Sequence, residues 1–248
     1  MSLVMDKYDF VDEQQSLRCF SIIFGVSQVF GALAVILVAV WMGNYDGGFG
    51  WQDTPKQQFH YHPMFMVIGM LFLYGEAILI YRLFRHEKKR LTKIAHMVLH
   101  SFVFLFFTLA LKAVFADNMY TLHSWIGLST VLLFCLQYAA GFISFFFPGL
   151  PLSTRQWYMP IHHFCGIAIF IFAGATALMG MAERAAFHVY SNGGTCDKDK
   201  FCSEGVVVNF LGVSLFLYCI CVVYLVVNPR FKRRPLPEEE MLYPLTAD

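Results

Sequence analysis

Charged residues are scarce in this chain of 248 residues. Asp, Glu, Lys and Arg make up 14% of it, whereas hydrophobic residues make up 58% and aromatic residues 17%. A water-soluble domain of this size carries about a quarter charged residues, because polar groups must cover its surface. The shortage of charged residues excludes an ordinary soluble fold and a basic surface that binds nucleic acid. It predicts that a lipid bilayer covers much of the chain.

Polar stretches long enough to form a second domain are also lacking. Six apolar runs reach the roughly 20 residues with which a helix crosses about 30 Å of hydrocarbon. The predicted spans are Leu17–Met42, His62–Tyr81, Ile94–Ala116, Tyr120–Phe147, Met159–Met181 and Val206–Val227. The runs lack the alternation of polar and apolar residues that a membrane β-barrel requires. We therefore predict an all-α integral membrane protein with six transmembrane helices.

Basic residues are distributed unevenly between the two sides of this topology. If both termini lie in the cytosol, 13 of the 18 Lys and Arg residues lie there too, as the positive-inside rule favours. The first run is too long for a signal-peptide core and lacks a cleavage pattern, so we interpret it as a retained helix. We expect a cytosolic N-terminus (1–16), a membrane domain (17–228) and a disordered cytosolic tail (229–248).

The chain contains no Cys-x-x-Cys-His motif, so covalent attachment of haem is not expected. Five of the seven cysteines lie in the apolar runs, where they are expected to pack as small hydrophobic residues. Cys196 and Cys202 lie in the polar loop before the last span, outside the cytosol in this topology. Disulfides persist in such compartments, and we predict one between these two residues.

Six histidines lie within the predicted spans, at the starts of four consecutive helices. Ionisable residues inside a membrane are costly and usually mark function. The six are His62, His96, His100, His123, His162 and His163, whereas His60, His86 and His188 fall in loops and are interpreted as solvated surface side chains.

Consecutive helices cross the membrane in opposite directions, so these histidines form two groups at two depths. His62 and His123 begin spans on the outer side, and His96 and His162 begin spans on the cytosolic side. Each pair offers one imidazole from each of two helices, the arrangement that holds a planar iron porphyrin from above and below. A structural zinc site would need four ligands at one point. Helix rise and bilayer thickness place two such irons roughly 20 Å apart.

Two other histidines compete for these roles. His100 follows His96 by one turn, and His163 adjoins His162, so the sequence leaves the choice open. Their distances from flanking basic residues favour His96 and His162. A single histidine in a membrane is explained equally well by a hydrogen bond to a neighbouring helix. Glu76, in the second span, is protonated, paired or involved in proton movement.

Several segments resemble the cytochrome b561 family of ascorbate-dependent transmembrane electron-transfer proteins. The resemblance covers residues 59–228 approximately, and its most specific parts are Leu-His-Ser-Trp and Pro-Ile-His. It is carried by Phe-His-Tyr-His-Pro-Met at 59–64, Tyr-Arg at 81–82, Lys-Ile-Ala-His at 93–96, Asn-Met-Tyr-Thr-Leu-His-Ser-Trp at 118–125, Leu-Ser-Thr-Arg at 152–155 and Met-Pro-Ile-His at 159–162.

The resemblance implies two haem b groups in a bundle of helices two to five, and typically a homodimer. It implies that His62 pairs with His123 on the outer haem and that His96 pairs with His162 on the cytosolic haem. It also implies further contacts, from Arg82, Lys89, Asn118, Met119, Tyr120, Thr121 and Glu183 to the haems and from Lys89, Lys93 and Arg155 to ascorbate.

The expected activity is oxidation of cytosolic ascorbate and transfer of the electron to an outer acceptor, monodehydroascorbate or ferric iron. Lys89 and Lys93 are four residues apart and His96 follows within a turn, so an anion bound there would lie beside the inner haem. The expected membrane is endosomal, lysosomal or secretory-vesicle, or alternatively the plasma membrane.

Two alternatives compete with this function. One is a haem protein with another donor, such as a quinol, and the other is a non-enzymatic membrane scaffold or transporter. The sequence also lacks the loop histidines of the ferric-reducing animal members, which weakens the expectation of a specific ferric-ion site.

Overall fold

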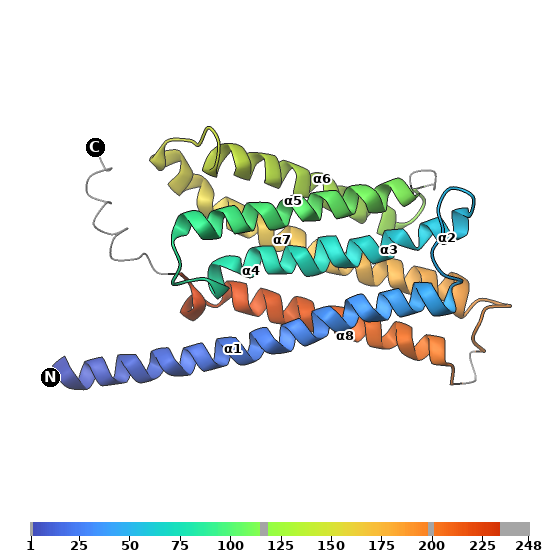
Figure 1. Cartoon of the computed structure of the whole chain (residues 1–248), viewed down its shortest axis with the longest axis horizontal. Coiled ribbons are helices and arrows are strands. Elements are labelled where there is room, and N and C mark those ends of the chain that lie inside the picture. Colours follow the sequence, from blue (N-terminus) through green and yellow to red (C-terminus); the bar gives the residue numbers. More distant parts are fainter. Residues whose placement is uncertain (1, 115–118, 198–200, 234–248) are drawn as a thin grey trace.

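The computed structural model describes residues 2–114, 119–197 and 201–233, and every regular element in these ranges is helical. The elements are α1 (Ser2–Val40), η1 (Trp41–Tyr45), α2 (Pro55–Phe59), α3 (Tyr61–Met66), η2 (Val67–Leu73), α4 (Tyr74–Leu83), α5 (Lys89–Val114), α6 (Leu122–Phe145), α7 (Leu152–Arg184), η3 (Ala185–Val189), α8 (Ser203–Val227) and η4 (Pro229–Phe231). They lie roughly along one long axis (Figure 1), and they form six spans long and apolar enough to cross a membrane. The prediction of an all-α protein with six spans is confirmed.

Two spans are each longer than predicted by nine residues or more. The second begins at Pro55, and the fifth runs from Leu152 to Val189. Hydropathy detects only the residues that lie in hydrocarbon, whereas the backbone hydrogen bonds of a helix continue into its polar flanks. In these longer helices, the polar residues at the ends belong to the same helix as the histidines, so their positions relative to the histidines are fixed.

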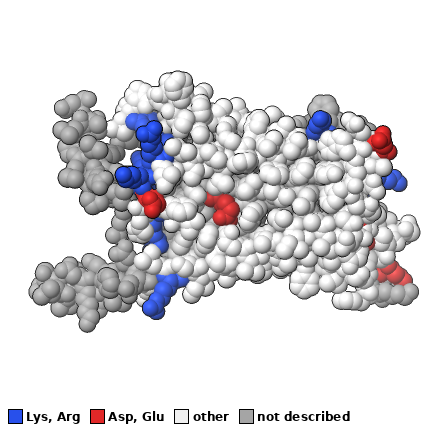
Figure 2. Space-filling view, viewed as in Figure 1, with Lys and Arg blue, Asp and Glu red and all other residues white. Residues whose placement is uncertain are grey.

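Large apolar side chains face outward along the bundle. Phe164 is 72% exposed, Leu136 67% and Ile22 67%. Figure 2 shows that Lys and Arg gather near one end of the visible face, while most of its length is uncharged. Such a surface is covered by lipid rather than by water, so the chain is a multi-pass integral membrane protein.

The helices pack in neighbouring sets. α1 lies mainly along α8, α6 along α7, and α5 along the span formed by α3, η2 and α4. At the contact of α4 with α8, a Cβ on Gly75 would lie 2.2 Å from the Tyr218 hydroxyl, so only glycine permits this approach. α1 begins at the same end of the bundle at which η4 ends (Figure 1), as an even number of spans requires.

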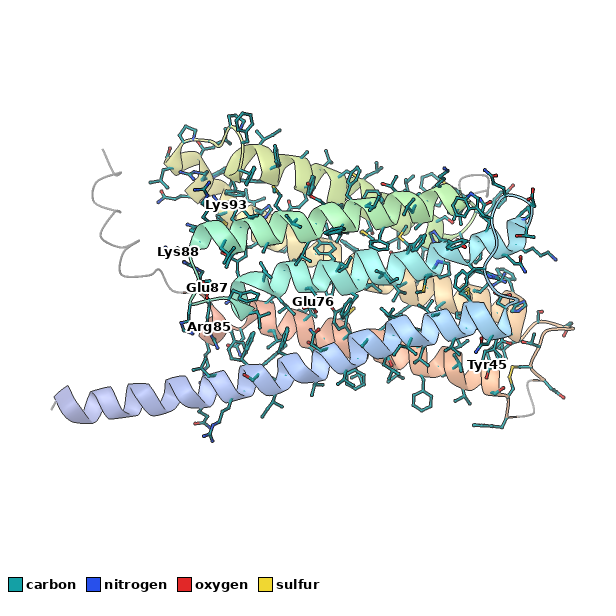
Figure 3. All side chains as sticks on the ribbon, viewed as in Figure 1. Tyr45, Glu76, Arg85, Glu87, Lys88 and Lys93 are labelled. Atoms are coloured by element: carbon teal, nitrogen blue, oxygen red, sulfur yellow. A yellow bond between two sulfur atoms is a disulfide. The ribbon has the colours of Figure 1, made fainter. Side chains whose placement is uncertain are left out.

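Glu76 is hydrogen-bonded between α1, α4 and α8. Its Oε1 atom accepts from Gln28 Nε2 at 2.7 Å and from the Tyr218 hydroxyl at 3.3 Å, and that hydroxyl also lies 2.9 Å from the Phe72 carbonyl. Figure 3 shows Glu76 between α1 and α4, far from the charged residues Arg85, Glu87 and Lys88 at the end of α4. The partners of Glu76 in α1 and α8 are therefore neutral hydrogen-bond donors, and its role in proton movement stays a prediction.

A buried polar cluster joins the helices at the other end of the bundle. The Asp46 carboxylate is 5% exposed and accepts from Arg184 Nε at 3.0 Å. It lies 3.3 Å from His60 Nε2 and 3.1 Å from His188 Nε2. His60 is 1% exposed, so its interpretation as a solvated histidine was wrong. The cluster joins residues more than a hundred positions apart, which no local pattern reveals.

The Cys196–Cys202 disulfide lies beside this cluster, with its Cα atoms 5.8 Å apart. Its loop leads into α8, where Glu204 is 3% exposed and accepts from Trp41 Nε1 at 2.9 Å and from the Thr195 hydroxyl. The loop is therefore tied to the end of the first span as well as to α8.

The chain stays ordered beyond the last span. Residues Pro229–Phe231 form η4, and Phe231 is 1% exposed with its ring centre 5.3 Å from that of Phe20. Arg233 Nη2 donates to the Glu87 carbonyl at 2.8 Å. The prediction that disorder begins at residue 229 was wrong, because burial of Phe231 fixes this segment. The rest of the predicted tail, 234–248, lies outside the described residues.

Candidate functional site

The first histidine pair brings α3 together with α6. The rings of His62 and His123 have their centres 6.1 Å apart at an interplanar angle of 89°. His62 Nδ1 lies 3.3 Å from the Ala110 carbonyl, and His123 Nδ1 lies 2.9 Å from the Thr176 carbonyl. With the proton on Nδ1, both rings donate to backbone and keep Nε2 as the lone-pair nitrogen, as metal-ligating histidines do.

The second pair brings α5 together with α7. The rings of His96 and His162 have their centres 6.3 Å apart at 68°. His96 Nδ1 lies 2.7 Å from the Ala77 carbonyl, whereas His162 Nδ1 is buried without a hydrogen-bond partner. The His100 ring is 4.5 Å from that of His96 and packs edge-on against it. The geometry thus pairs His162 with His96 and leaves His100 as a neighbour of the pair.

Glycines on facing helices make room for two of these rings. A Cβ on Gly180 would lie 2.5 Å from His123 Cε1, and a Cβ on Gly141 would lie 2.9 Å from His162 Cε1. The contact between α6 and α7 is therefore of the same kind at both ends. At each end, a histidine of one helix packs against a glycine of the other. Any larger residue at either glycine would push the ring out of its position.

The two pairs lie far apart along the bundle. His62 contacts α5 at Ala110, fourteen residues after His96 on the same helix. On α7, fourteen residues likewise separate His162 from Thr176, which His123 contacts. At the rise of an α-helix, both helices give a separation of about 21 Å. The distance between the two histidine pairs is thus close to the distance that the sequence predicted between two irons.

Buried aromatic rings fill the core between the pairs. Tyr74, Phe134 and Phe170 are at most 2% exposed. The Tyr74 ring lies 4.9 Å from His100, 5.4 Å from Phe134 and 5.6 Å from Phe170, and its hydroxyl donates to the Gly166 carbonyl at 2.9 Å. The core between the histidine pairs is thus closely packed with side chains.

The spacing of each pair fits a metal held between two imidazoles. A metal–nitrogen bond of about 2 Å on each side, with the ring centre about 1 Å further, would separate the centres of two ligating rings by about 6 Å. Both observed spacings match this value. Among the described residues, no hydrogen bond occupies Nε2 of any of the four histidines. The donor set therefore fits a bis-histidine haem at each pair.

Three cations converge beside the His96–His162 pair. The charges of Lys89 and Arg155 both act on Lys93, whose Nζ donates to the Phe145 carbonyl at 2.9 Å. Arg155 Nε is buried without a hydrogen-bond partner. Like charges held this close attract an anion, and an unpaired buried donor requires an acceptor. Figure 3 places Lys93 near the start of α5, at the basic end of the bundle.

A second basic group lies nearby and is built from residues far apart in the sequence. Arg82 donates from Nη1 to the Asn228 carbonyl at 3.4 Å and also donates to the Val226 carbonyl. The charges of Arg82 and Lys232 both act on the ring of His163. Lys232 was missed by the sequence reasoning, because it follows the last span and looks like part of a solvated tail.

The residues predicted to surround the His62–His123 haem lie near the start of α6 and the end of α7. Thr121 caps α6, and its hydroxyl accepts from Ser124 N at 3.3 Å. Tyr120 and Met119 are 81% and 43% exposed. Glu183 follows Gly180, the contact of His123, by three residues, and Asn118 lies outside the described residues.

These features define a class of helical membrane proteins with two pairs of facing histidines inside the bundle. Residues 61–188 match the profile of eukaryotic cytochrome b561. The whole chain is 46% identical to the "Putative transmembrane ascorbate-dependent reductase CYB561 homolog" of Caenorhabditis elegans, with 98% of that protein covered. The chain belongs to the cytochrome b561 family.

Two further relatives come from a mammal and a plant. The "Transmembrane ascorbate-dependent reductase CYB561" of Mus musculus is 41% identical, with 87% of this chain and 86% of that protein covered. The "Probable ascorbate-specific transmembrane electron transporter 1" of Oryza sativa subsp. japonica is 33% identical, with 85% of this chain and 91% of that protein covered. Membership of the family implies haem b as the cofactor.

Proposed function

We propose that this protein is a transmembrane oxidoreductase that passes electrons from cytosolic ascorbate, through two haem b groups, to an acceptor on the other side of its membrane. Its relatives are named ascorbate-dependent reductases, which supports ascorbate-dependent electron transfer across the membrane. The observation that carries the proposal is the two histidine pairs, with ring centres 6.1 and 6.3 Å apart, at opposite ends of the bundle.

His62 with His123, and His96 with His162, are the residues that would hold the two haem groups. Bound haem b supplies a one-electron iron couple at each pair. The backbone carbonyls that accept from Nδ1 of His62, His96 and His123 hold these rings in one orientation and raise the basicity of Nε2. Arg82, Lys89, Glu183 and residues 118–121 are the further proposed haem contacts.

Lys89, Lys93 and Arg155 are proposed to bind ascorbate beside the inner pair. Ascorbate is a monoanion at neutral pH, and it loses one electron and one proton to become monodehydroascorbate. The Arg155 Nε donor and the Lys93 ammonium can both donate to its oxygens. Binding at this position brings the donor next to His96 and His162 rather than to the other end of the bundle.

The proposed outer acceptors are monodehydroascorbate and ferric iron. Both are one-electron acceptors, and Tyr120 and Met119 offer exposed surface beside the His62–His123 pair. With both termini cytosolic, that pair faces a lumenal or extracellular compartment of the endosomal, lysosomal or secretory-vesicle membrane, or of the plasma membrane. A homodimer is proposed as the assembly.

The visible spectrum of the purified protein tests donor and cofactor together. Haem and protein are quantified, and the spectrum is recorded before and after addition of ascorbate. We expect two b-type haems per chain, both reduced by ascorbate. If a quinol reduces the haems and ascorbate does not, the electron donor is a quinol and the proposed donor is wrong. If the purified protein binds no haem, the proposed electron transfer is wrong, and a scaffold or transporter is the remaining function.

The glycines beneath the histidine rings provide a selective test of the two sites. Gly180→Ala is expected to displace His123 and weaken the outer haem, and Gly141→Ala to displace His162 and weaken the inner haem, because the added Cβ atoms would lie 2.5 and 2.9 Å from the rings. We expect about a tenfold loss of haem retention at one site only, as outer-shell changes around metal sites produce. Redox titration of the two haems measures it.

Gly25→Ala serves as the control, since nothing lies within 4 Å of a Cβ at that position. Equal effects of the Gly141 and Gly180 variants on both haems would contradict the assignment of one ring pair to each site.

A further inference from the structure

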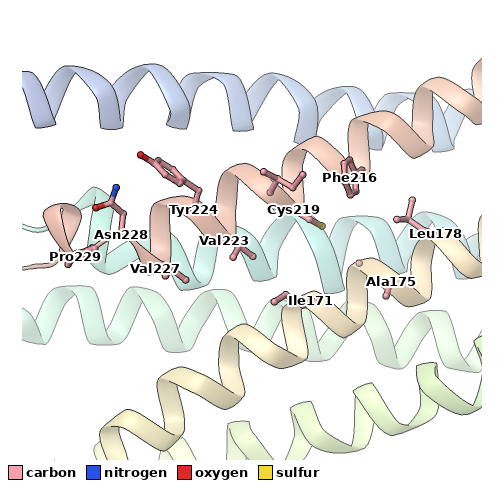
Figure 4. A pocket seen from close by; sticks show the side chains of 12 residues that line it. Ile171, Ala175, Leu178, Phe216, Cys219, Val223, Tyr224, Val227, Asn228 and Pro229 are labelled. Atoms are coloured by element: carbon pink, nitrogen blue, oxygen red, sulfur yellow. The ribbon is translucent and has the colours of Figure 1, made fainter.

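An apolar groove runs between α7 and α8 on the outside of the bundle. It encloses about 780 Å³ and is shown from close by in Figure 4. Gly174 and Ala175 form its small-residue side on α7, and Phe216, Val223 and Val227 form its side on α8. A Cβ on Gly174 would lie 2.9 Å from Cys219 Sγ, so the two helices already touch beneath the groove. The groove is therefore a feature of the lipid-facing surface and not an opening into the core.

The groove has the length of one leaflet. Its α8 side extends from Phe216 to Val227, which corresponds to about 17 Å of helix. The hydrocarbon of one leaflet is half of a core of roughly 30 Å, or about 15 Å. A transmembrane helix of a second copy would instead need a seam that continues across both leaflets.

One end of the groove is polar and basic. The groove ends at Asn228 and Pro229, and Arg230 follows directly with an exposed side chain. Asn228 Oδ1 accepts from Arg230 N at 3.0 Å, which leaves the Asn228 amino group for an outside acceptor. Tyr224, 46% exposed, lies one turn deeper on the same wall. The Tyr224 hydroxyl and the Asn228 amide at the end of an apolar groove, with an exposed arginine next in the chain, match the phosphate and acyl chains of a lipid.

We propose that this groove binds one anionic glycerophospholipid from the leaflet at the basic end of the bundle. Its acyl chains lie along α7 and α8, and its phosphate is held by Arg230 and Asn228. The charge of Arg230 makes the site prefer an anionic to a zwitterionic headgroup. The site is separate from the histidine pairs, so its occupancy is measured without reference to reduction of the haems.

Native mass spectrometry of the full chain tests the proposal. The protein is reconstituted with equal amounts of dioleoyl phosphatidylglycerol and dioleoyl phosphatidylcholine, then released, and retained lipid is counted by mass. We expect one phosphatidylglycerol per chain. Ala175→Phe fills the groove from an exposed position and is expected to abolish retention. Arg230→Gln is expected to lower the ratio of anionic to zwitterionic lipid about fivefold, the effect of one cation near a membrane surface.

Matched controls come from exposed positions away from the groove. Ala139→Phe on α6 and Arg18→Gln on α1 are expected to retain lipid as the unchanged protein does. Unchanged retention in both Ala175→Phe and Arg230→Gln would overturn the proposal. Conversion of a dimer to a monomer by Ala175→Phe, with no lipid retained by the unchanged protein, would also overturn it and assign the groove to a second copy of the chain.

Discussion

Replacing either member of one histidine pair by alanine is expected to remove one haem and leave the other. His62→Ala and His123→Ala should give the same result, because the rings lie 6.1 Å apart and hold one cofactor between them. His96→Ala and His162→Ala should remove the other haem. Haem content should fall by half in each variant, and electron transfer across a vesicle membrane by at least about a hundredfold. Haem quantification and vesicle assays measure both effects.

The two remaining histidines of the spans are the controls. His100→Ala and His163→Ala are expected to keep both haems, because neither ring forms a facing pair across the bundle within the described part of the chain. His100 is 9% exposed and lies against Tyr74, so its replacement is expected to lower stability without changing haem content. A half loss of haem in His100→Ala, with full haem in His96→Ala, would reassign the ligand.

Removing the cations beside the inner pair is expected to weaken the use of ascorbate without removing haem. Lys93→Ala and Arg155→Ala should each raise the KM for ascorbate about tenfold, since a charge-assisted hydrogen bond contributes roughly 1.5–3 kcal/mol and both side chains are only partly buried. The maximal rate at saturating ascorbate should change less. Stopped-flow reduction of the haems over a range of ascorbate concentrations separates the two quantities.

Dithionite provides the internal reference, because it should reduce both haems completely in every variant. Arg90→Ala is the matched substitution, since Arg90 is an exposed cation on the same helix as Lys93. An effect of Arg90→Ala as large as that of Lys93→Ala would indicate general attraction of anions by the basic end. Unchanged KM in Lys93→Ala and Arg155→Ala would contradict the proposed donor site.

The apolar spans were predictable because the bilayer imposes a length and a composition on any helix that crosses it. The spans also set the depths of His62, His96, His123 and His162, so their arrangement in two groups followed from chain direction alone. The ends of the helices were harder to predict from the sequence. α7 begins seven residues earlier than hydropathy predicted, and it brings Arg155 into the same helix as His162.

The polar cluster around Asp46 depends on contacts that local sequence patterns do not reveal. His60 looks like a loop residue, yet it is buried beside Asp46 because the loop after α1 folds back on α7 and η3. Phe231 likewise looks like part of a charged tail, yet it packs on Phe20 of α1. In both cases the partner is distant in the sequence, and burial depends on that partner.

The sequence by itself determined the membrane class of this protein, the number of its spans and which histidines begin them. These properties depend on composition and on the order of residues along each helix. The tertiary structure decided which imidazole faces which, that the ring of His96 faces that of His162, which neutral donors contact Glu76, and where α7 and α8 leave a groove. These depend on rotation and contact between helices, which are set by side-chain packing across distant segments and not by the periodicity of any one of them.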